Sequence, residues 1–219
     1  MSNKVELFEQ NRHQKPNLAW AGGGLHSPSR GRKYLNAEER WRVLSCVHVL
    51  SRRAAPFVLT LAWTGARISE VLALSAHSFD VDRSVVAIVT LKRRRPIVRE
   101  VPIPRWLMMA LDKEFGITSA QRNPITASLR LWTCSRVTAW RWVKTVMAVS
   151  GVTGVRATPR GFRHAFGVIA LEHVPITLVK KWMGHARLTT TEIYLEVSGA
   201  EELAFAERFW TATGAASHV

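Results

Sequence analysis

The stretch "SVVAIVTLKRRRPIVREVPIP", residues 84 to 104, decides what kind of fold this chain of 219 residues adopts. Residues 84–91 and 97–104 are runs of β-type side chains, and "KRRRP" separates them. Two such runs joined by a short polar segment are typical of a β-hairpin. We therefore predict a small antiparallel hairpin with a basic tip.

Helical signals stand on both sides of this hairpin. Asn36 suits an N-cap, Glu39 can complete a capping box, and Gly65 suits the end of a helix. Helices are predicted over 36–51, 55–65, 66–75, 104–115, 135–151, 158–174, 175–184 and 199–210. The fold class expected is mainly α with a small antiparallel β-sheet (α+β).

The domain organisation follows from composition. Residues 1–35 contain "AGGGLHSPSRGRK" and are predicted to form a basic, flexible arm, either a disordered tail or a segment that follows a phosphate backbone. Residues 36–211 are expected to form one domain, followed by a tail at 212–219.

The net charge indicates a polyanionic partner. The chain has 31 Lys and Arg against 16 Asp and Glu, a formal charge of +15. Nucleic acid is the first interpretation, and a membrane surface is the alternative. The longest apolar run, residues 54–66, is too short to span a bilayer, and no signal peptide is recognisable. The two cysteines have no metal-ligand spacing and form no disulfide framework, so we expect a cytoplasmic protein. The chain also lacks a carboxylate cluster that would hold a metal, and no cofactor is expected.

Basic residues gather at the predicted helix start "TPRGFRHAF", residues 158 to 166. Arg160, Arg163 and His164 project from nearly one face. Cations are disfavoured at a helix N-terminus unless an anion binds there. The segment therefore indicates a phosphate site, and surface solvation or an acidic neighbour is the alternative.

Other cations allow two interpretations each. Arg67 either pairs with Glu70 or clamps a phosphate. Lys92, with Arg93, Arg94 and Arg95 after it, either forms a solvated turn or reaches a nucleic-acid groove, where the lysine could donate a proton.

The predicted helix over 135–151 and the segment "WMGHARLTTTEIYLEV", residues 182 to 197, are also ambiguous alone. Arg141 and Lys144 lie at i, i+3 on a polar face that either contacts DNA or is the outer side of a core helix. His185 follows Gly184, and Tyr194 is one of two tyrosines in the chain. That tyrosine is either a packing residue or a nucleophile.

In order, "TGARISEVLAL", the lysine of "TLKRRRPIVREVPIP", "TPRGFRHAF" and "WMGHARLTTTEIYLEV" resemble the catalytic domain of the tyrosine recombinases, or phage-type integrases. The resemblance implies a double-stranded DNA substrate and a 3′-phosphotyrosyl intermediate. It assigns phosphate binding to Arg67, Arg163 and His185, protonation of the leaving 5′ oxygen to Lys92, and attack to Tyr194.

Two features depart from that family's pattern. Arg160 stands where the family usually has a histidine, and an arginine binds phosphate but is a poor proton shuttle. Most members also carry an N-terminal core-binding domain that closes the clamp on DNA. Here we expect that the arm substitutes for it, that a partner supplies the clamp, or that the chain is a stand-alone minimal version.

The function expected is a site-specific DNA recombinase or integrase without a cofactor. The alternatives are a type IB-like topoisomerase or resolvase, and a non-catalytic DNA-binding regulator on the same scaffold. In isolation, Leu203, Ala206 and Trp210 at helical spacing indicate a core helix over 199–210. The resemblance implies instead that this helix docks on a neighbouring copy, in a dimer or tetramer on DNA. No membrane association is expected.

Overall fold

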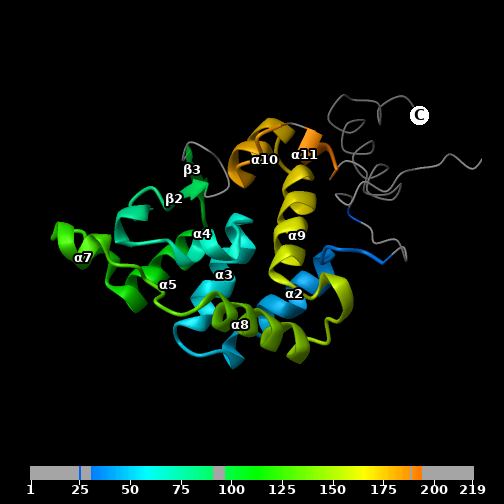
Figure 1. Ribbon diagram of the computed structural model, residues 1–219, viewed down its shortest axis with the longest axis horizontal. Helices are drawn as coiled ribbons and strands as arrows, with labels where there is room; N and C mark the ends of the chain where they lie inside the picture. Colours follow the sequence, from blue (N-terminus) through cyan, green and yellow to red (C-terminus); the bar gives the residue numbers. More distant parts are fainter. Residues whose placement is uncertain (1–24, 26–30, 91–96, 188, 194–219) are drawn as a thin grey trace, which may run out of the picture.

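Helices make up most of the computed structural model, which describes residues 25, 31–90, 97–187 and 189–193 (Figure 1). The α-helices are α2 Ala37–Ser45, α3 Ala54–Thr64, α4 Ile68–Leu72, α5 Arg105–Phe115, α6 Ile117–Ala120, α7 Pro124–Ser128, α8 Arg136–Val149, α9 Pro159–Leu171, α10 Ile176–Met183 and α11 Thr189–Glu192. Short 3₁₀ turns are η2 Val47–Val49, η3 Ala76–Ser78 and η4 Gly154–Arg156. The predicted fold class is confirmed.

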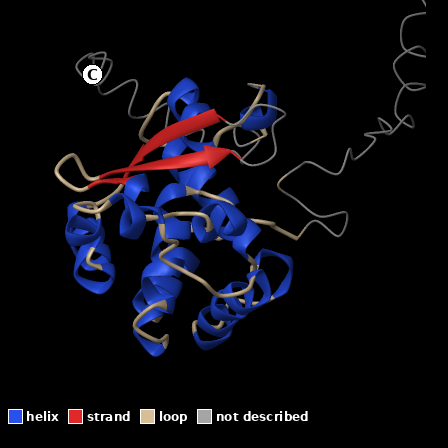
Figure 2. Cartoon of the chain, turned by 60° about the vertical axis from the view of Figure 1, so that its left-hand side comes forward, coloured by secondary structure: helices blue, strands red, loops and turns tan. Residues whose placement is uncertain are grey.

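One small sheet lies along one side of the helices (Figure 2). Its antiparallel strands are β1 Phe79–Asp80, β2 Val85–Thr90 and β3 Ile97–Pro102, in the order β1-β2-β3. The predicted hairpin is confirmed, and Thr90 pairs with Ile97 at its base. Strand β1 was not predicted, because two residues are too few to display a strand period.

The α3–α4 turn brings Gly65 beside α9. Gly65 ends α3 as predicted, in the left-handed conformation with φ 60°. A Cβ at this position would lie 2.5 Å from the ring of Phe166 on α9. The turn can approach α9 this closely only with glycine.

Predicted helix starts agree better with the structure than predicted helix lengths. Asn36 and Glu39 form the expected capping box of α2. The helix predicted over 36–51 is too long, because α2 ends at Ser45 and the valine-containing turn η2 follows. Helices α6, α7 and α11 were not predicted, since each is only four or five residues long.

The main core surrounds α3, which packs against α5, α8 and α9. Its largest fully buried side chains include Phe57, Leu61, Leu107 and Met147. A second apolar cluster joins Leu25 and Tyr34, Val168 of α9, and Val179 and Met183 of α10. This second cluster fixes α10 on α9 and buries one of the two tyrosines of the chain.

Several predictions lie outside the described residues: most of the arm, the hairpin tip and the helix over 199–210. Among the helices that are described, none has the length and apolar character required to cross a membrane.

Candidate active site

Arg163 is buried at the junction of three segments. Its Nη1 donates to the carbonyl oxygen of Gly65 at 2.5 Å, and its Nη2 donates to that of Met183 at 2.7 Å. The helix that carries it starts as predicted, because the Thr158 hydroxyl accepts from the backbone N–H of Gly161. Arg163 therefore ties α9 to the α3–α4 turn and to the end of α10.

Arg67 is the N-cap residue of α4, and its side chain pairs with Glu70. Its Nη1 lies 2.8 Å from Glu70 Oε1, and its backbone N–H donates to Oε2 at 2.9 Å. The predicted salt bridge is therefore present. The Arg67 side chain is 28% exposed, and a guanidinium has five N–H donors. The ion pair with Glu70 therefore does not exclude phosphate binding by the other N–H donors of Arg67.

Arg99 of β3 is a site residue that the sequence reading missed. It is buried, with Nη2 at 2.7 Å from Glu70 Oε2, Nη1 donating to Thr90 Oγ1 at 2.9 Å, and Nε donating to the Trp182 carbonyl at 2.7 Å. A signal was available in the strand period, because Arg99 shares its face with Val101, whose side chain is also buried.

Glu70 is the acidic centre of this cluster. Burial raises the pKa of its carboxyl group, but the charge of Arg99 and the hydrogen bonds from Arg67 and Arg99 outweigh that effect and lower the pKa below its ordinary value. Glu70 is therefore ionised at neutral pH. One carboxylate between two guanidinium groups leaves the cluster net positive.

His185 follows the left-handed Gly184 that ends α10. Its Nδ1 lies 2.9 Å from the hydroxyl oxygen of Thr191 on α11, which the sequence reading also missed. Burial, followed by the charges of Arg163, Arg67 and Arg99, lowers the pKa of His185 to about 3. The ring is neutral at pH 7, and the three arginines lie close enough to act on it.

The end of α10 lies directly against the base of the hairpin, near β3 in Figure 1. A Cβ at Gly184 would lie 2.9 Å from Thr90 Oγ1 and 3.1 Å from Arg99 Cδ. The close approach and the φ of 66° both require glycine here. Gly184 thus sets the spacing between His185 and the hairpin.

Arg160 and His164 contact each other at the start of α9. Arg160 is exposed, and its Nε donates to Nε2 of the buried His164 at 3.1 Å. Burial and then the charges of Arg160 and Arg163 lower the pKa of His164 to about 4, so it accepts as a neutral ring. The predicted shared face holds for this pair, whereas Arg163 turns toward Gly65 and Met183.

The two predicted DNA-contact residues of α8 differ. Arg141 is exposed. Lys144 is half-buried, donates from Nζ to the Ala157 carbonyl at 3.1 Å, and lies 5.8 Å from the ring centre of Trp140. Lys144 therefore holds the segment before α9 in place, and α8 itself packs on α4.

The remaining predicted site residues, Lys92, Arg93, Arg94, Arg95 and Tyr194, lie outside the described residues. Their neighbours in sequence are described. Thr90 pairs with Ile97 at the base of the hairpin, and Ile193 packs against the second apolar cluster. In the described part of the chain, no group of three or more His, Cys, Asp or Glu side chains could hold a metal.

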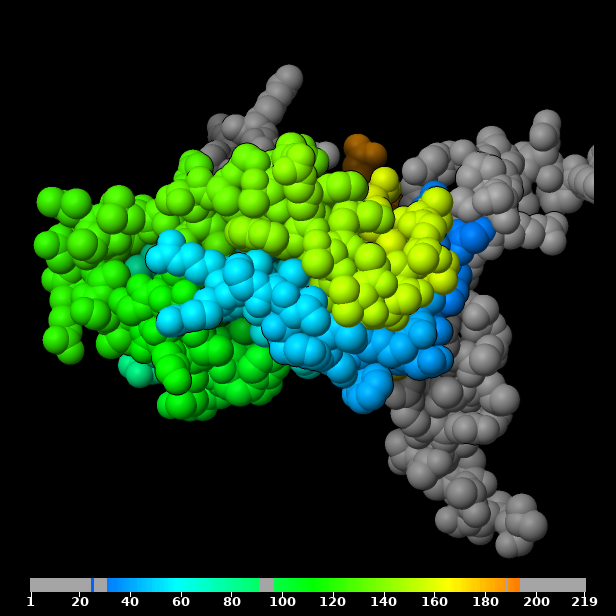
Figure 3. Space-filling view, turned by 90° about the horizontal axis from the view of Figure 1, so that it is seen from below, coloured from blue at the N-terminus to red at the C-terminus, as the bar shows by residue number. Residues whose placement is uncertain are grey.

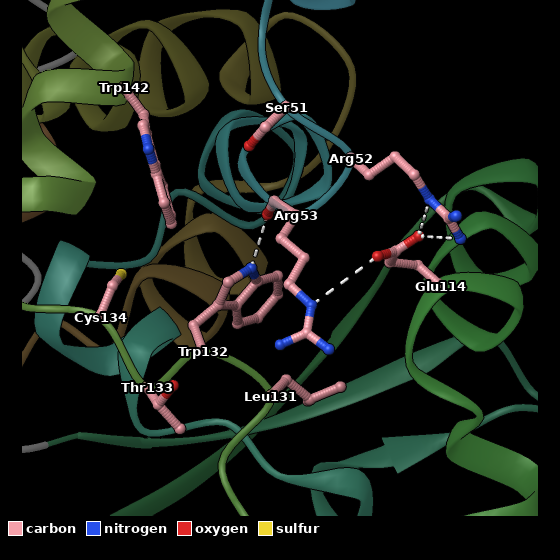
Figure 4. A pocket seen from close by; sticks show the side chains of 9 residues that line it. All are labelled: Ser51, Arg52, Arg53, Glu114, Leu131, Trp132, Thr133, Cys134 and Trp142. Atoms are coloured by element: carbon pink, nitrogen blue, oxygen red, sulfur yellow. Dashed lines mark hydrogen bonds and ion pairs between the residues drawn. The ribbon is translucent and has the colours of Figure 1, made fainter.

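A pocket of about 650 Å³ lies at the other end of α3 (Figure 4). Arg52 and Arg53 approach Glu114 there, and Trp132 Nε1 donates to the Arg53 carbonyl at 2.8 Å. Figure 3 shows this part of the chain in cyan, between the green segment of α5 to α7 and the yellow-green segment of α8. Of the catalytic candidates that the structure describes, Arg67, Arg160, Arg163 and His185 all lie outside its lining.

The mainly helical fold with one three-stranded antiparallel sheet agrees with the expected catalytic domain of the tyrosine recombinase class. The family model described as "Phage integrase family" matches residues 33–201. The chain belongs to that family, and the predicted family resemblance is confirmed.

Relatives within the family include recombinases and a resolvase. The chain is 30% identical over 176 residues to tyrosine recombinase XerA of Thermococcus onnurineus, covering 76% of this chain and 58% of that relative. It is 29% identical over 194 residues to a resolvase of Escherichia coli, covering 75% and 71%. The chain thus spans under two thirds of the XerA relative's length.

Solved structures share the fold. A XerA recombinase crystal structure matches with a TM-score of 0.64 and 21% identity, over 82% of this chain and 64% of that chain. A XerH site-specific recombinase bound to a palindromic difH substrate in a post-cleavage complex matches with a TM-score of 0.64 and 20% identity, over 82% and 53%.

Proposed function

We propose that this chain is a site-specific DNA recombinase or integrase that cleaves and rejoins DNA through a 3′-phosphotyrosyl intermediate. One observation carries the proposal: Arg67, Arg163 and His185 come from three distant parts of the sequence and meet where the α3–α4 turn, α9 and the end of α10 join. A scissile phosphate is the ligand that this arrangement fits.

The arginines supply charge where the reaction needs it. Negative charge develops on the non-bridging oxygens of a phosphodiester during attack, and fixed donors stabilise it. Arg163 is held by two carbonyl oxygens and Arg67 by Glu70, so neither has to be reorganised. The loss of one such donor typically lowers the rate by about 10² to 10³.

His185 contributes as a neutral donor. When the Thr191 hydroxyl donates to Nδ1, the ring proton sits on Nε2, the tautomer that can donate to a phosphate oxygen. The pKa of His185 near 3 keeps this neutral form populated at pH 7 before DNA arrives.

Tyr194 is the proposed nucleophile. The other tyrosine, Tyr34, is only 4% exposed in the second apolar cluster, so it could not reach DNA without unpacking. The Tyr194 oxygen would bond to phosphorus as the bond to the 5′ oxygen breaks, and Lys92 would give that oxygen its proton. No metal or cofactor is needed for this exchange.

The arginine at position 160 has a specific consequence in this proposal. Arg160 would bind the phosphate while His164 Nε2 holds its guanidinium in place. The proton of Tyr194 then has no histidine at position 160 to accept it. We therefore propose that the cationic site, with Arg67, Arg160 and Arg163, lowers the pKa of the tyrosine enough for its hydroxyl to release the proton to water before attack.

We propose that Arg93, Arg94 and Arg95 at the hairpin tip, and Arg141 on α8, contact the DNA backbone, with Lys144 contributing less because of its bond to Ala157. We also propose that the chain acts in the cytoplasm as a dimer or tetramer on DNA, in which the helix over 199–210 docks on a neighbouring copy. The catalytic domain would extend from residue 36 to residue 211.

A resolvase is the second candidate, because the chain resembles a protein of that name from Escherichia coli over 71% of its length. Resolution and integration share the same cleavage chemistry and differ in the arrangement of sites. A type IB-like topoisomerase, with the same chemistry, and a non-catalytic regulator are less favoured, because the family comparisons are to recombinases, integrases and resolvases.

The test is covalent capture on DNA. The recognition site would first be selected from random duplexes and then built into a substrate with a nick near the scissile bond, which traps the cleaved product. We expect an adduct on a denaturing gel with the full chain and none with Tyr194→Phe. Salt-sensitive binding without an adduct, on a verified site, would favour the regulator instead.

A further inference from the structure

Arg99 of β3 is buried, and its whole guanidinium group is engaged within the fold. We propose that it is a positioning residue for strand cleavage, an inference that rests on the proposed function. Each of its three guanidinium nitrogens has a different partner, on α4, on β2 and at the end of α10. Arg99 thus links the parts of the chain that carry Arg67, the hairpin lysine and His185.

The link to Arg67 runs through Glu70. Oε1 of Glu70 accepts from Arg67 at 2.8 Å, while Oε2 accepts from Arg99 at 2.7 Å. Arg99 and Glu70 are both buried, whereas Arg67 is partly exposed. Because Arg99 neutralises one side of the carboxylate, Arg67 need not satisfy it alone and can turn donors toward a phosphate.

The link to the hairpin runs through Thr90. Its hydroxyl accepts from Arg99 Nη1 at 2.9 Å, and Lys92 stands two residues further along the sequence. The link to His185 runs through the Trp182 carbonyl, which accepts from Arg99 Nε at 2.7 Å. Arg99 therefore fixes the base of the hairpin relative to the turn that carries the histidine.

Lysine at position 99 could not make the three bonds that Arg99 makes. A guanidinium is a planar fork with donors in fixed directions, whereas an ammonium is a single point on a flexible stem. Arg99→Lys keeps the charge beside Glu70 but cannot reach Glu70, Thr90 and Trp182 together. We expect this variant to lower the single-turnover cleavage rate by about 10- to 100-fold, somewhat less than the loss of a direct donor.

A neutral substrate separates positioning from general damage to the fold. Replacing one non-bridging oxygen of the scissile phosphate with a methyl group removes its negative charge, so a correctly placed Arg67 matters less. We expect the rate loss of Arg99→Lys to shrink to within about 3-fold on this methylphosphonate, while the Kd for the uncleaved phosphodiester site stays within about 2-fold of the wild type.

Two further variants make the test decisive. Thr90→Val preserves shape and leaves Arg99 with two of its three bonds, which loosens its hold on Glu70 and so the placement of Arg67. A smaller loss, still confined to the phosphodiester, is therefore expected even if Arg99→Lys folds poorly. Arg52→Lys is the matched control, because Arg52 pairs with Glu114 away from the site and should leave both rates unchanged.

The outcomes are distinguishable. Equal losses on both substrates, or no loss, for Arg99→Lys and Thr90→Val would overturn the positioning role while the wild-type adduct still supports the proposed function. The absence of any adduct from the wild type on its verified site would overturn the proposed function and this inference with it.

Discussion

Each end of α3 has a cluster in which two arginines meet one glutamate, and the two clusters differ mainly in burial. Beyond the C-terminal end, Arg99 and Glu70 have side chains 3% and 0% exposed. At the N-terminal end, Arg52 and Glu114 have side chains 84% and 13% exposed. Water can replace a lost partner at the second cluster but not at the first. The buried cluster can therefore hold a rigid geometry, whereas the exposed cluster lines a pocket at the protein surface.

The largest contrast is expected from removing each glutamate. Glu70→Ala leaves Arg99 with an uncompensated buried charge, which typically costs about 3 to 5 kcal/mol. Glu114→Ala should cost no more than about 1 kcal/mol, because Arg52 becomes hydrated. Urea unfolding of both variants measures the difference. Similar losses at the two positions would contradict the distinction drawn from burial.

The second largest effect is expected from acid, which should lower the free energy of unfolding through the two buried histidines of the candidate site. The pKa values of His164 and His185, lowered to about 4 and about 3, lie below those of the unfolded chain, so the unfolded state binds more protons as pH falls below about 6.5. The free energy of unfolding should therefore be lower at pH 5 than at neutral pH by about 2 kcal/mol for each of the two histidines.

Urea unfolding across that pH range checks the acid effect. His164→Gln should flatten the pH dependence by about half, because it removes one of the two buried rings. An unaltered curve in His164→Gln would show that the buried ring does not stay neutral.

A smaller and more local contrast comes from two glycines. Gly116 and Gly184 both end helices with φ near 60°, but only Gly184 has atoms within 4 Å of where a Cβ would lie. Alanine at either position should cost about 1 to 2 kcal/mol for the left-handed backbone.

Cleavage rate distinguishes these two glycines. Gly184→Ala should also slow cleavage, because its Cβ displaces Thr90 or Arg99, whereas Gly116→Ala should cleave at the wild-type rate. Single-turnover rates of the two alanine variants provide the measurement. Equal rates would argue against close packing between α10 and the hairpin as a requirement for activity.

The smallest effect is expected on α8. Arg141→Ala should weaken binding to all duplexes alike and reduce the slope of log K against log salt by about 1, as expected for one phosphate contact. Lys144→Ala should change that slope less, because Lys144 already bonds to Ala157. Fluorescence titrations at several salt concentrations would show the difference, and a larger change for Lys144 would reverse the assignment.

The features of the fold and of the candidate site that could be predicted are those determined by residues close together in the sequence. The hairpin, the Gly65 turn and the Thr158 cap follow from neighbouring residues and were predicted. The three bonds of Arg99 depend on strand register and on how α10 packs, which no short segment reveals. Sequence reading could identify Arg67 and Glu70 as a pair but not the second arginine that shares the carboxylate.

The same limit applies to the histidines. The family resemblance indicated His185, but nothing in the run of three threonines singled out its partner Thr191. The contact between Arg160 and His164 followed from helical spacing, whereas the inward turn of Arg163 required the whole fold.

Mapping the covalently attached nucleotide tests the central claim most directly. The trapped adduct would be digested with nuclease and trypsin, and the modified peptide sequenced by mass spectrometry. The account predicts that the nucleotide lies on Tyr194, within the tryptic peptide of residues 188–208. A nucleotide on Tyr34 or on a serine, or an adduct that persists in Tyr194→Phe, would contradict it.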